Sequence, residues 1–384
     1  MADEISAVIN QLGFSPETVI VLAILAVVIV GAVVVIIASR PVLDIYPYLN
    51  PIARVRARKG RLFNEKQLSE VIESSNIEEI TNYLRGFPDY ANHLDDYSLE
   101  KALDIQLAET YDLISKLAPK DIQDAFTVLA KKYDINNIKS LIAAKEMGLT
   151  EDETSNLLIP AGRLYSEIEH LADVNTVTDV IAGLDNTEYS AVLEDALPEY
   201  EESKMVLPLG SALDKYYLEN LLKSSGIPSD ENSQILYSYI GEQVDVSNIK
   251  LIIRAKADGL SYDKASSYVI ADGYQLREWK LKDMMESEDV AGVISSLEGT
   301  DYAPTLGDSL SKYNETGSIS VFEKALDEYL IEKAKSFSTR KPLGIGPILG
   351  YLSQKEREIK NLKIIIRAKR EINFPISEIK EMLI

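Results

Sequence analysis

Residues 137–145 read NIKSLIAAK, and close copies follow as NIKLIIRAK at 248–256 and NLKIIIRAK at 361–369. In the second copy, Ile249, Ile252 and Ile253 have the i, i+3, i+4 spacing of one apolar helix face. Strand-type alternation is scarce elsewhere, and helical periodicity also surrounds the other repeated elements. We therefore predict an all-α protein in which this stretch, named here the signature, forms one helix in each of three repeats.

Two further landmarks precede each signature in constant order. The tripeptide Ala-Leu-Asp lies 35 or 36 residues upstream, and an acidic residue followed by tyrosine lies before that. The resulting unit of about 100 to 112 residues is longer than the roughly 20–50 residues of a solenoid repeat. We therefore expect three homologous helical modules around a pseudo-threefold axis. Their boundaries are 60–159, 162–270 and 273–384.

The ends of the signature helix have their own signals. Gly148 and Gly259, with Asn373 as the third equivalent, tolerate the left-handed conformation that closes a helix. Thr150 and Glu153 have the spacing of a capping box, so a further helix is expected to begin there. The third copy has a comparable start at 375–378.

Composition and charge exclude several classes of function. A chain that is 46% hydrophobic and 26% charged is an ordinary globular one. Its net charge of −21 repels phosphate backbones, so no nucleic acid is expected as a partner. There is no cysteine, and the two histidines, His93 and His170, lie outside any ligand-spaced cluster. We expect no catalytic residue, no metal and no cofactor.

Residues 18–39 contain no charged residue and are almost wholly aliphatic. At 1.5 Å per residue they extend about 33 Å, which is enough to cross a membrane. A cleaved signal peptide is the alternative, but the preceding segment, 1–17, has acidic residues and no Lys or Arg. A transmembrane helix is therefore predicted.

Basic residues follow the apolar stretch within the segment 40–59, which we interpret as a linker. By the positive-inside rule they place the N-terminus outside the cell. The helical modules are then expected on the cytoplasmic face of the cell membrane. The basic residues, one of which lies just beyond the linker, are Arg40, Arg54, Arg56, Arg58, Lys59 and Arg61.

One lysine and one aspartate recur in every repeat. The lysine ends the signature and projects from its apolar side, where it can reach the last carbonyls of its own helix. The alternative is an ion pair within each module, because a buried lysine without a partner is costly. The candidate pairs are Asp104 with Lys145, Asp214 with Lys256, and Asp327 with Lys369.

The last helix reverses the local charge. Between residues 355 and 370 there are seven basic and two acidic residues. Four of the basic residues share one face, which is either solvated or a contact for an acidic protein partner. These candidate partner-contact residues are Lys360, Lys363, Arg367 and Arg370.

The segment 344–352, GIGPILGYL, followed by KEREIKNL at 355–362, closely resembles the C-terminal signature of the C subunit of the archaeal A-type ATP synthase. That family is the counterpart of the d subunit of vacuolar-type (V-type) ATPases. Residues 48–50, YLN, and 53–58, ARVRAR, are similar to its opening. The resemblance covers residues 46–384. The glycines within 344–350 lack the Gly-Lys-Ser/Thr of a phosphate loop and are expected to form a turn into the last helix.

The resemblance implies a funnel-shaped, non-catalytic adaptor on the proteolipid rotor ring, with a socket for the D and F subunits of the central stalk. Torque would pass through it during ATP synthesis driven by an ion gradient. The N-terminal helix departs from the family, whose typical members begin near the equivalent of Tyr48. A membrane-anchored helical-repeat scaffold unrelated to ATP synthase is the alternative, and an enzyme is disfavoured because the polar candidates repeat in all three modules.

Overall fold

The computed structural model describes residues 16–259, 266–371 and 374–384 of the chain. Most of the predicted N-terminal segment and Asn373 lie outside these residues. The described part contains helices and no strand, which confirms the all-α prediction. The chain divides into two compact units, Met1–Leu49 and Asn50–Ile384.

The first unit, as far as it is described, consists of the N-terminal part of helix α2 (Pro16–Lys59). This is the one helix in the described residues that is long and apolar enough to cross a membrane. Most of its aliphatic side chains are exposed among the described residues, and Val27, for example, is 72% exposed. Helix α2 therefore has an exposed apolar surface of membrane-spanning length, which suits contact with lipid or with a partner protein.

Helix α2 continues through the segment 40–59, which we interpret as a linker, so this connection is helical. No glycine interrupts this segment before Gly60, and the run 53–59 contains good helix formers. Pro47 and Pro51 lie inside the helix although each lacks a backbone N–H and presses its ring against the carbonyl four residues earlier. The boundary between the two units falls between these prolines.

The second unit follows from Asn50. Its helices in chain order are α3 (Glu65–Glu73), α4 (Ile77–Leu84), α5 (Pro88–Ala91), α6 (Leu99–Leu117), α7 (Gln123–Ala130), α8 (Lys132–Glu146), α9 (Glu151–Leu157), α10 (Tyr165–His170), η1 (Leu171–Asp173), α11 (Val177–Gly183), α12 (Ser190–Ser203), α13 (Leu207–Ser224), α14 (Glu231–Ala257), α16 (Glu278–Glu286), α17 (Val290–Ser296), α18 (Tyr302–Thr316), α19 (Ser320–Arg340), α20 (Gly346–Arg370) and α21 (Ile376–Met382).

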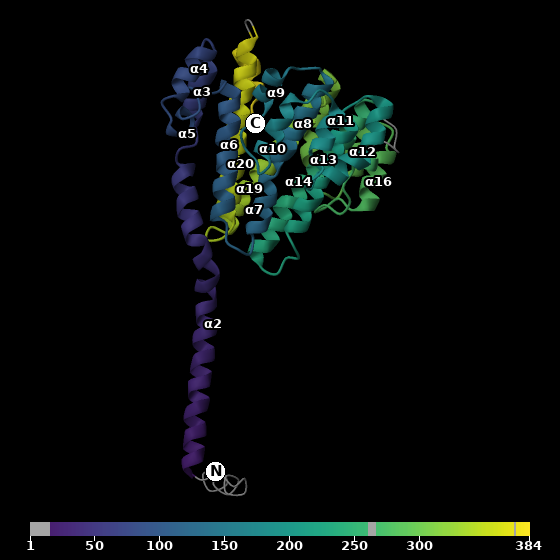
Figure 1. Ribbon diagram of the computed structural model, residues 1–384. Helices are drawn as coiled ribbons and strands as arrows, with labels where there is room; N and C mark the ends of the chain where they lie inside the picture. Colours follow the sequence, from purple (N-terminus) through teal and green to yellow (C-terminus); the bar gives the residue numbers. More distant parts are fainter. Residues whose placement is uncertain (1–15, 260–265, 372–373) are drawn as a thin grey trace. The chain divides into compact units, whose positions relative to one another are not determined.

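The repeated sequence elements lie in helices, as predicted. The signatures lie in α8, α14 and α20, and the Ala-Leu-Asp tripeptides lie in α6, α13 and α19. Figure 1 shows α20 running beside α6 and α19, which it contacts closely. The first and last parts of this unit are therefore neighbours in space.

The predicted helix ends are confirmed where the structure describes them. Gly148 and Gly259 have φ of 69° and 67°, the left-handed conformation that a residue without Cβ adopts at low cost. Thr150 and Glu153 form the capping box of α9. Helix α20 begins at Gly346 with a proline in its first turn, so the glycine-rich segment is a turn into the last long helix.

Three hydrophobic clusters of the described residues form the cores of the second unit. One packs α8 against α10 to α13, and another packs α14 against α16 to α19. The third packs α20 against α3 to α6. Each core thus joins a signature helix to the elements of the next sequence repeat, and the last signature helix packs on the first repeat. The modules predicted from the sequence stay a proposal, since they interlock through these cores.

Candidate interaction site

The asparagine that opens each signature is buried and binds the backbone of one isoleucine. Asn137 donates from Nδ2 to the carbonyl of Ile159 and accepts from its N–H, both at 2.8 Å. Two hydrogen bonds of 2.7 and 3.0 Å join Asn248 to Ile270. The last asparagine, Asn361, makes two bonds of 2.9 Å with Ile384. A side-chain amide offers one donor and one acceptor in this geometry, which explains why the signature contains asparagine.

An acidic residue lies three positions before each of these asparagines, and our sequence reasoning missed it. Asp134 accepts a hydrogen bond from the N–H of Leu164 at 2.9 Å. The N–H of Gln275 donates to Asp245 at 2.6 Å, and that of Phe63 donates to Glu358 at 2.5 Å. Each acceptor therefore holds the start of the next repeat, and the last one holds the first. The regular spacing from the asparagine was the signal that could have found these residues.

The repeated tyrosine landmark takes part in these contacts in two of the three repeats. Tyr302 donates its hydroxyl to Asp245 at 2.9 Å, and Tyr90 donates to Glu358. Burial raises the pKa of Asp245 to about 6, although backbone N–H groups and the Tyr302 hydroxyl oppose the rise. Burial, followed by the charge of Asp245, raises the pKa of Tyr302. The phenol is therefore a neutral hydrogen-bond donor that holds the carboxylate in place.

The predicted ion pairs within each module are wrong. Lys145 donates to the carbonyl of Ala172 at 2.6 Å and to the Thr154 hydroxyl at 3.2 Å. Lys256 donates to the carbonyl of Met285 at 2.5 Å. Lys369 is half-buried, and the carboxylate predicted for it, Asp327, is held by other lysines. The first two lysines thus bind carbonyls of the following repeat rather than an aspartate of their own.

The three repeated aspartates pair with a different lysine, the third residue of each signature. Two residues along a helix correspond to about 200° of rotation, so this lysine leaves the face opposite the buried asparagine and reaches a neighbouring helix. The pairs join consecutive repeats, and the last joins the third repeat to the first. They are Lys139 with Asp214 at 2.6 Å, Lys250 with Asp327 at 2.5 Å, and Lys363 with Asp104 at 2.7 Å.

The four candidate partner-contact residues all have carboxylate partners within the chain. Lys360 pairs with Asp327, and Lys363 with Asp104. Glu100 accepts from Arg367 at 3.1 Å and from Arg370 at 2.7 Å. The two arginines are 67% and 56% exposed at their side chains, so their outer faces stay accessible. Their first role is to hold α20 against α6 and α19, and contact with a partner stays a proposal.

A polar cluster also lies where helices α6, α8 and α20 meet. Lys132 pairs with Glu356 at 2.8 Å and lies 3.7 Å from the centre of the Tyr111 ring. The Tyr111 hydroxyl donates to the same carboxylate. Burial, followed by the charge of Glu356, raises the pKa of Tyr111. Lys132, Gln243 and Glu356 each lie five residues before a signature asparagine, so equivalent positions carry a cation, an amide and a carboxylate.

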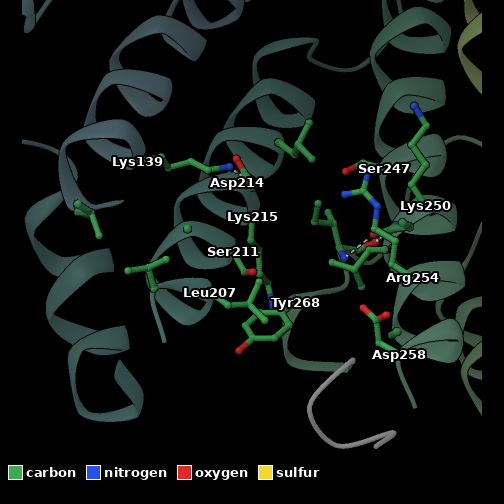
Figure 2. Close-up of a pocket in the computed structure, with 18 of the residues that line it drawn as sticks. Lys139, Leu207, Ser211, Asp214, Lys215, Ser247, Lys250, Arg254, Asp258 and Tyr268 are labelled. Atoms are coloured by element: carbon green, nitrogen blue, oxygen red, sulfur yellow. Dashed lines mark hydrogen bonds and ion pairs between the residues drawn. The ribbon is translucent and has the colours of Figure 1, made fainter. Parts of the chain in front are cut away.

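A groove adjoins each of the three repeated aspartates. The largest, of about 570 Å³, lies beside Asp214 between α8, α13 and α14. Figure 2 shows Lys139 reaching Asp214 across this groove, with Arg254 and Tyr268 on its other walls. Smaller grooves of about 310 and 230 Å³ lie beside Asp104 and Asp327.

The arrangement is suited to binding and to holding helices together. No group of three or more His, Asp and Glu side chains within the described residues has the geometry of a metal site. One of the two histidines, His93, lies 3.1 Å from Glu109, and no cysteine is available as a nucleophile beside it. These features define an all-helical protein whose repeated polar residues join its helices.

The chain belongs to the ATP synthase (C/AC39) subunit family, which it matches over residues 51–382. It is 64% identical to the C subunit of the A-type ATP synthase of Methanobrevibacter smithii and 55% identical to that of Methanothermobacter thermautotrophicus, over 100% of each chain. It is also 42% identical to the corresponding protein of Methanocaldococcus jannaschii, over 94% of this chain and 92% of that one.

The resemblance found in the sequence is thereby confirmed, and the alternative of an unrelated scaffold is wrong. The chain is a subunit of an ATP synthase. The first two relatives align with it from end to end, so the N-terminal stretch is shared with them and is not peculiar to this chain.

Proposed function

We propose that the chain is a non-catalytic adaptor of a rotary A-type ATP synthase. It joins the proteolipid rotor ring to the D and F subunits of the central stalk and passes torque between them during ion-driven ATP synthesis. Support comes from the relatives, each named as the C subunit of the A-type enzyme, and from polar residues that serve packing rather than chemistry.

The closed series of ion pairs carries the mechanical part of the proposal. Torque applies a shearing force to the protein that transmits it. The repeats must therefore be joined by more contacts than the backbone that connects them. Lys363 and Asp104 join positions 259 residues apart, and Glu358 reaches the Phe63 backbone across 295 residues. These long-range contacts link the last repeat to the first, and they are partly or wholly buried, where electrostatic interactions are less screened. Such a body turns as one piece.

The apolar part of α2 is proposed to cross the membrane with the N-terminus outside and the modules on the cytoplasmic face. A helix anchored beside the ring in lipid would meet the stator at each revolution. One inside the ring lumen would turn with the ring and fill an otherwise leaky space with an apolar surface. The charge-free, exposed stretch suits contact with lipid or ring helices on every side.

A pull-down of the full-length chain in mild detergent tests the proposal. We expect the proteolipid ring and the D and F subunits to be recovered with it, and no ATP hydrolysis by the chain alone. Recovery of stator proteins without the ring would contradict the adaptor role. In the assembled complex, the modules 60–159, 162–270 and 273–384 should in addition superpose by rotations of about 120°.

A further inference from the structure

We propose that the groove beside Asp214, named here the α13 groove, receives one helical segment of a central-stalk protein of the synthase, a segment that carries carboxylates next to apolar side chains. By binding at only one of three equivalent places, this segment fixes the rotational position of the partner on the chain. The inference rests on the proposed function and names the chemistry of the partner contact.

The α13 groove exists because one repeated ion pair is missing. Arg254 pairs with Glu323 at 2.5 Å and joins the second repeat to the third. Arg367 pairs with Glu100 at the equivalent positions and joins the third repeat to the first. Each arginine lies six residues after a signature asparagine, and each glutamate lies four residues before an Ala-Leu-Asp aspartate. The residues at these two positions in the third place are Ala143 and Gly210. Both line the α13 groove. Two small residues therefore leave open the space that an arginine and a glutamate fill elsewhere.

The junction of α19 and α20 is tightly packed near the C-terminal end of α19. Helices α19 and α20 approach so closely that a Cβ added to Gly346 would lie 2.1 Å from the carbonyl of Phe337. One added to Gly350 would lie 2.1 Å from the Ser338 hydroxyl. At Gly210, in contrast, the nearest atom is the Lys139 Cε at 3.6 Å. Among the described residues, the α13 groove thus has room for further side chains.

The lining of the α13 groove is net positive, whereas the whole chain is net negative. Four cations and two carboxylates line it, whereas the net charge of the chain is −21. Lys139, Lys250 and Arg254 already have carboxylate partners. Lys215 donates to the carbonyl of Ser267 at 2.9 Å and has no carboxylate partner among the described residues. The two residues equivalent to Lys215, Ile105 and Glu328, are not cations, so this charge is specific to the α13 groove.

Apolar side chains complete the lining. Ile142, Val206, Leu218 and Leu251 contribute to it, and Leu207 is 50% exposed there. A concave, mostly apolar surface between helices, rimmed by cations, matches an amphipathic helix that carries carboxylates at its edge. Three similar repeats would otherwise offer three similar binding sites. A partner can select one of them only by a feature that the other two lack.

The double substitution Ala143→Arg with Gly210→Glu tests the proposal. It recreates the pair found at the other two places, so it should preserve the fold while filling the α13 groove. In pull-downs of full-length chain, we expect the ring to be recovered as with wild type and the shaft proteins about tenfold less. Lys215→Glu should have a similar effect, and Lys116→Glu, on an exposed face of α6, should have none.

A photo-crosslinker at Ser211, which lines the α13 groove, identifies the occupant in the assembled complex. We expect a peptide of a central-stalk protein that contains Asp or Glu, and no such product from the equivalent Lys324. Wild-type recovery of every partner by the folded double variant would overturn the inference, as would equal crosslinking at both positions. Failure of wild type to recover the ring and shaft would instead defeat the proposed function.

Discussion

Lys363 and Asp104 form an ion pair at 2.7 Å although 259 residues separate them along the chain. Their side chains are only 23% and 22% exposed. The pair joins the last long helix to the first Ala-Leu-Asp helix. It is one of three equivalent contacts, the other two of which join neighbouring repeats. The contact between the last repeat and the first is therefore made by the same residue types, at equivalent positions, as the contacts between consecutive repeats.

We predict that a double-mutant cycle of Lys363→Met and Asp104→Asn gives a coupling energy of about 1 kcal/mol, because the pair is mostly shielded from water. Denaturant unfolding of the four proteins measures it. The exposed pair Lys116 and Asp112, with side chains 72% and 61% exposed, serves as the control and should give less than about 0.5 kcal/mol. Equal coupling for both pairs would argue against a role in closure.

Asn248→Ala should lower the free energy of unfolding by about 2–4 kcal/mol. The substitution leaves the buried N–H and carbonyl of Ile270 without partners, and each costs its desolvation penalty. Thermal or denaturant unfolding provides the measurement. Asn220→Ala, which removes a single bond to the carbonyl of Tyr216 within α13, should cost less than about 1 kcal/mol. A small effect at Asn248 would show that water replaces the amide.

We predict that protonation of Asp245 contributes to the pH dependence of the unfolding free energy. Because burial raises its pKa to about 6 in the folded protein, the folded state binds more protons than the unfolded state between about pH 4 and 6. Its contribution is present at low pH and is lost as pH rises through about 6. The difference in unfolding free energy between wild type and Asp245→Asn should change by about 3 kcal/mol over this range. Parallel curves for the two proteins would contradict the assignment, and Asp112→Asn controls for the loss of one surface charge.

Reversal of Arg367 and Arg370 to glutamate should weaken both the fold and the assembly. Since Glu100 pairs with both arginines, the variant places three carboxylates together and should lose about 1 kcal/mol of stability. Adding Glu100→Arg should restore the unfolding free energy. If the outer face of this stripe also meets an acidic partner, recovery of the partner stays low after this rescue and falls more steeply with salt. Full rescue of both would assign the stripe to the fold alone.

Crosslinkers at Leu25 and Val33 should report the surroundings of the apolar helix in the assembled complex. Both side chains are exposed within the chain, at 53% and 47%. We expect products with proteolipid subunits, because a helix in the ring lumen is enclosed by them. Mass spectrometry identifies the products, and exclusive attachment to the membrane stator would exclude the lumen.

Much of the architecture was predictable because it depends on local patterns. The apolar stripe of Ile249, Ile252 and Ile253 requires a helix, and Gly148 and Gly259 stop the signature helices by their left-handed backbone. The repeated asparagine and tyrosine were visible as landmarks, although their roles were not. Family membership followed from short motifs near both ends of the matched region.

The choice of partners was decided only by the tertiary structure. The sequence by itself placed an aspartate and two lysines in every repeat, and it does not say which lysine meets the carboxylate. The nearer choice along the chain, Lys145 for Asp104, was wrong, and Lys363 from the far end of the chain takes that place. An ion pair depends on where helices cross in space. That crossing is determined by cores that join each signature helix to the next repeat, which no spacing within one repeat can reveal.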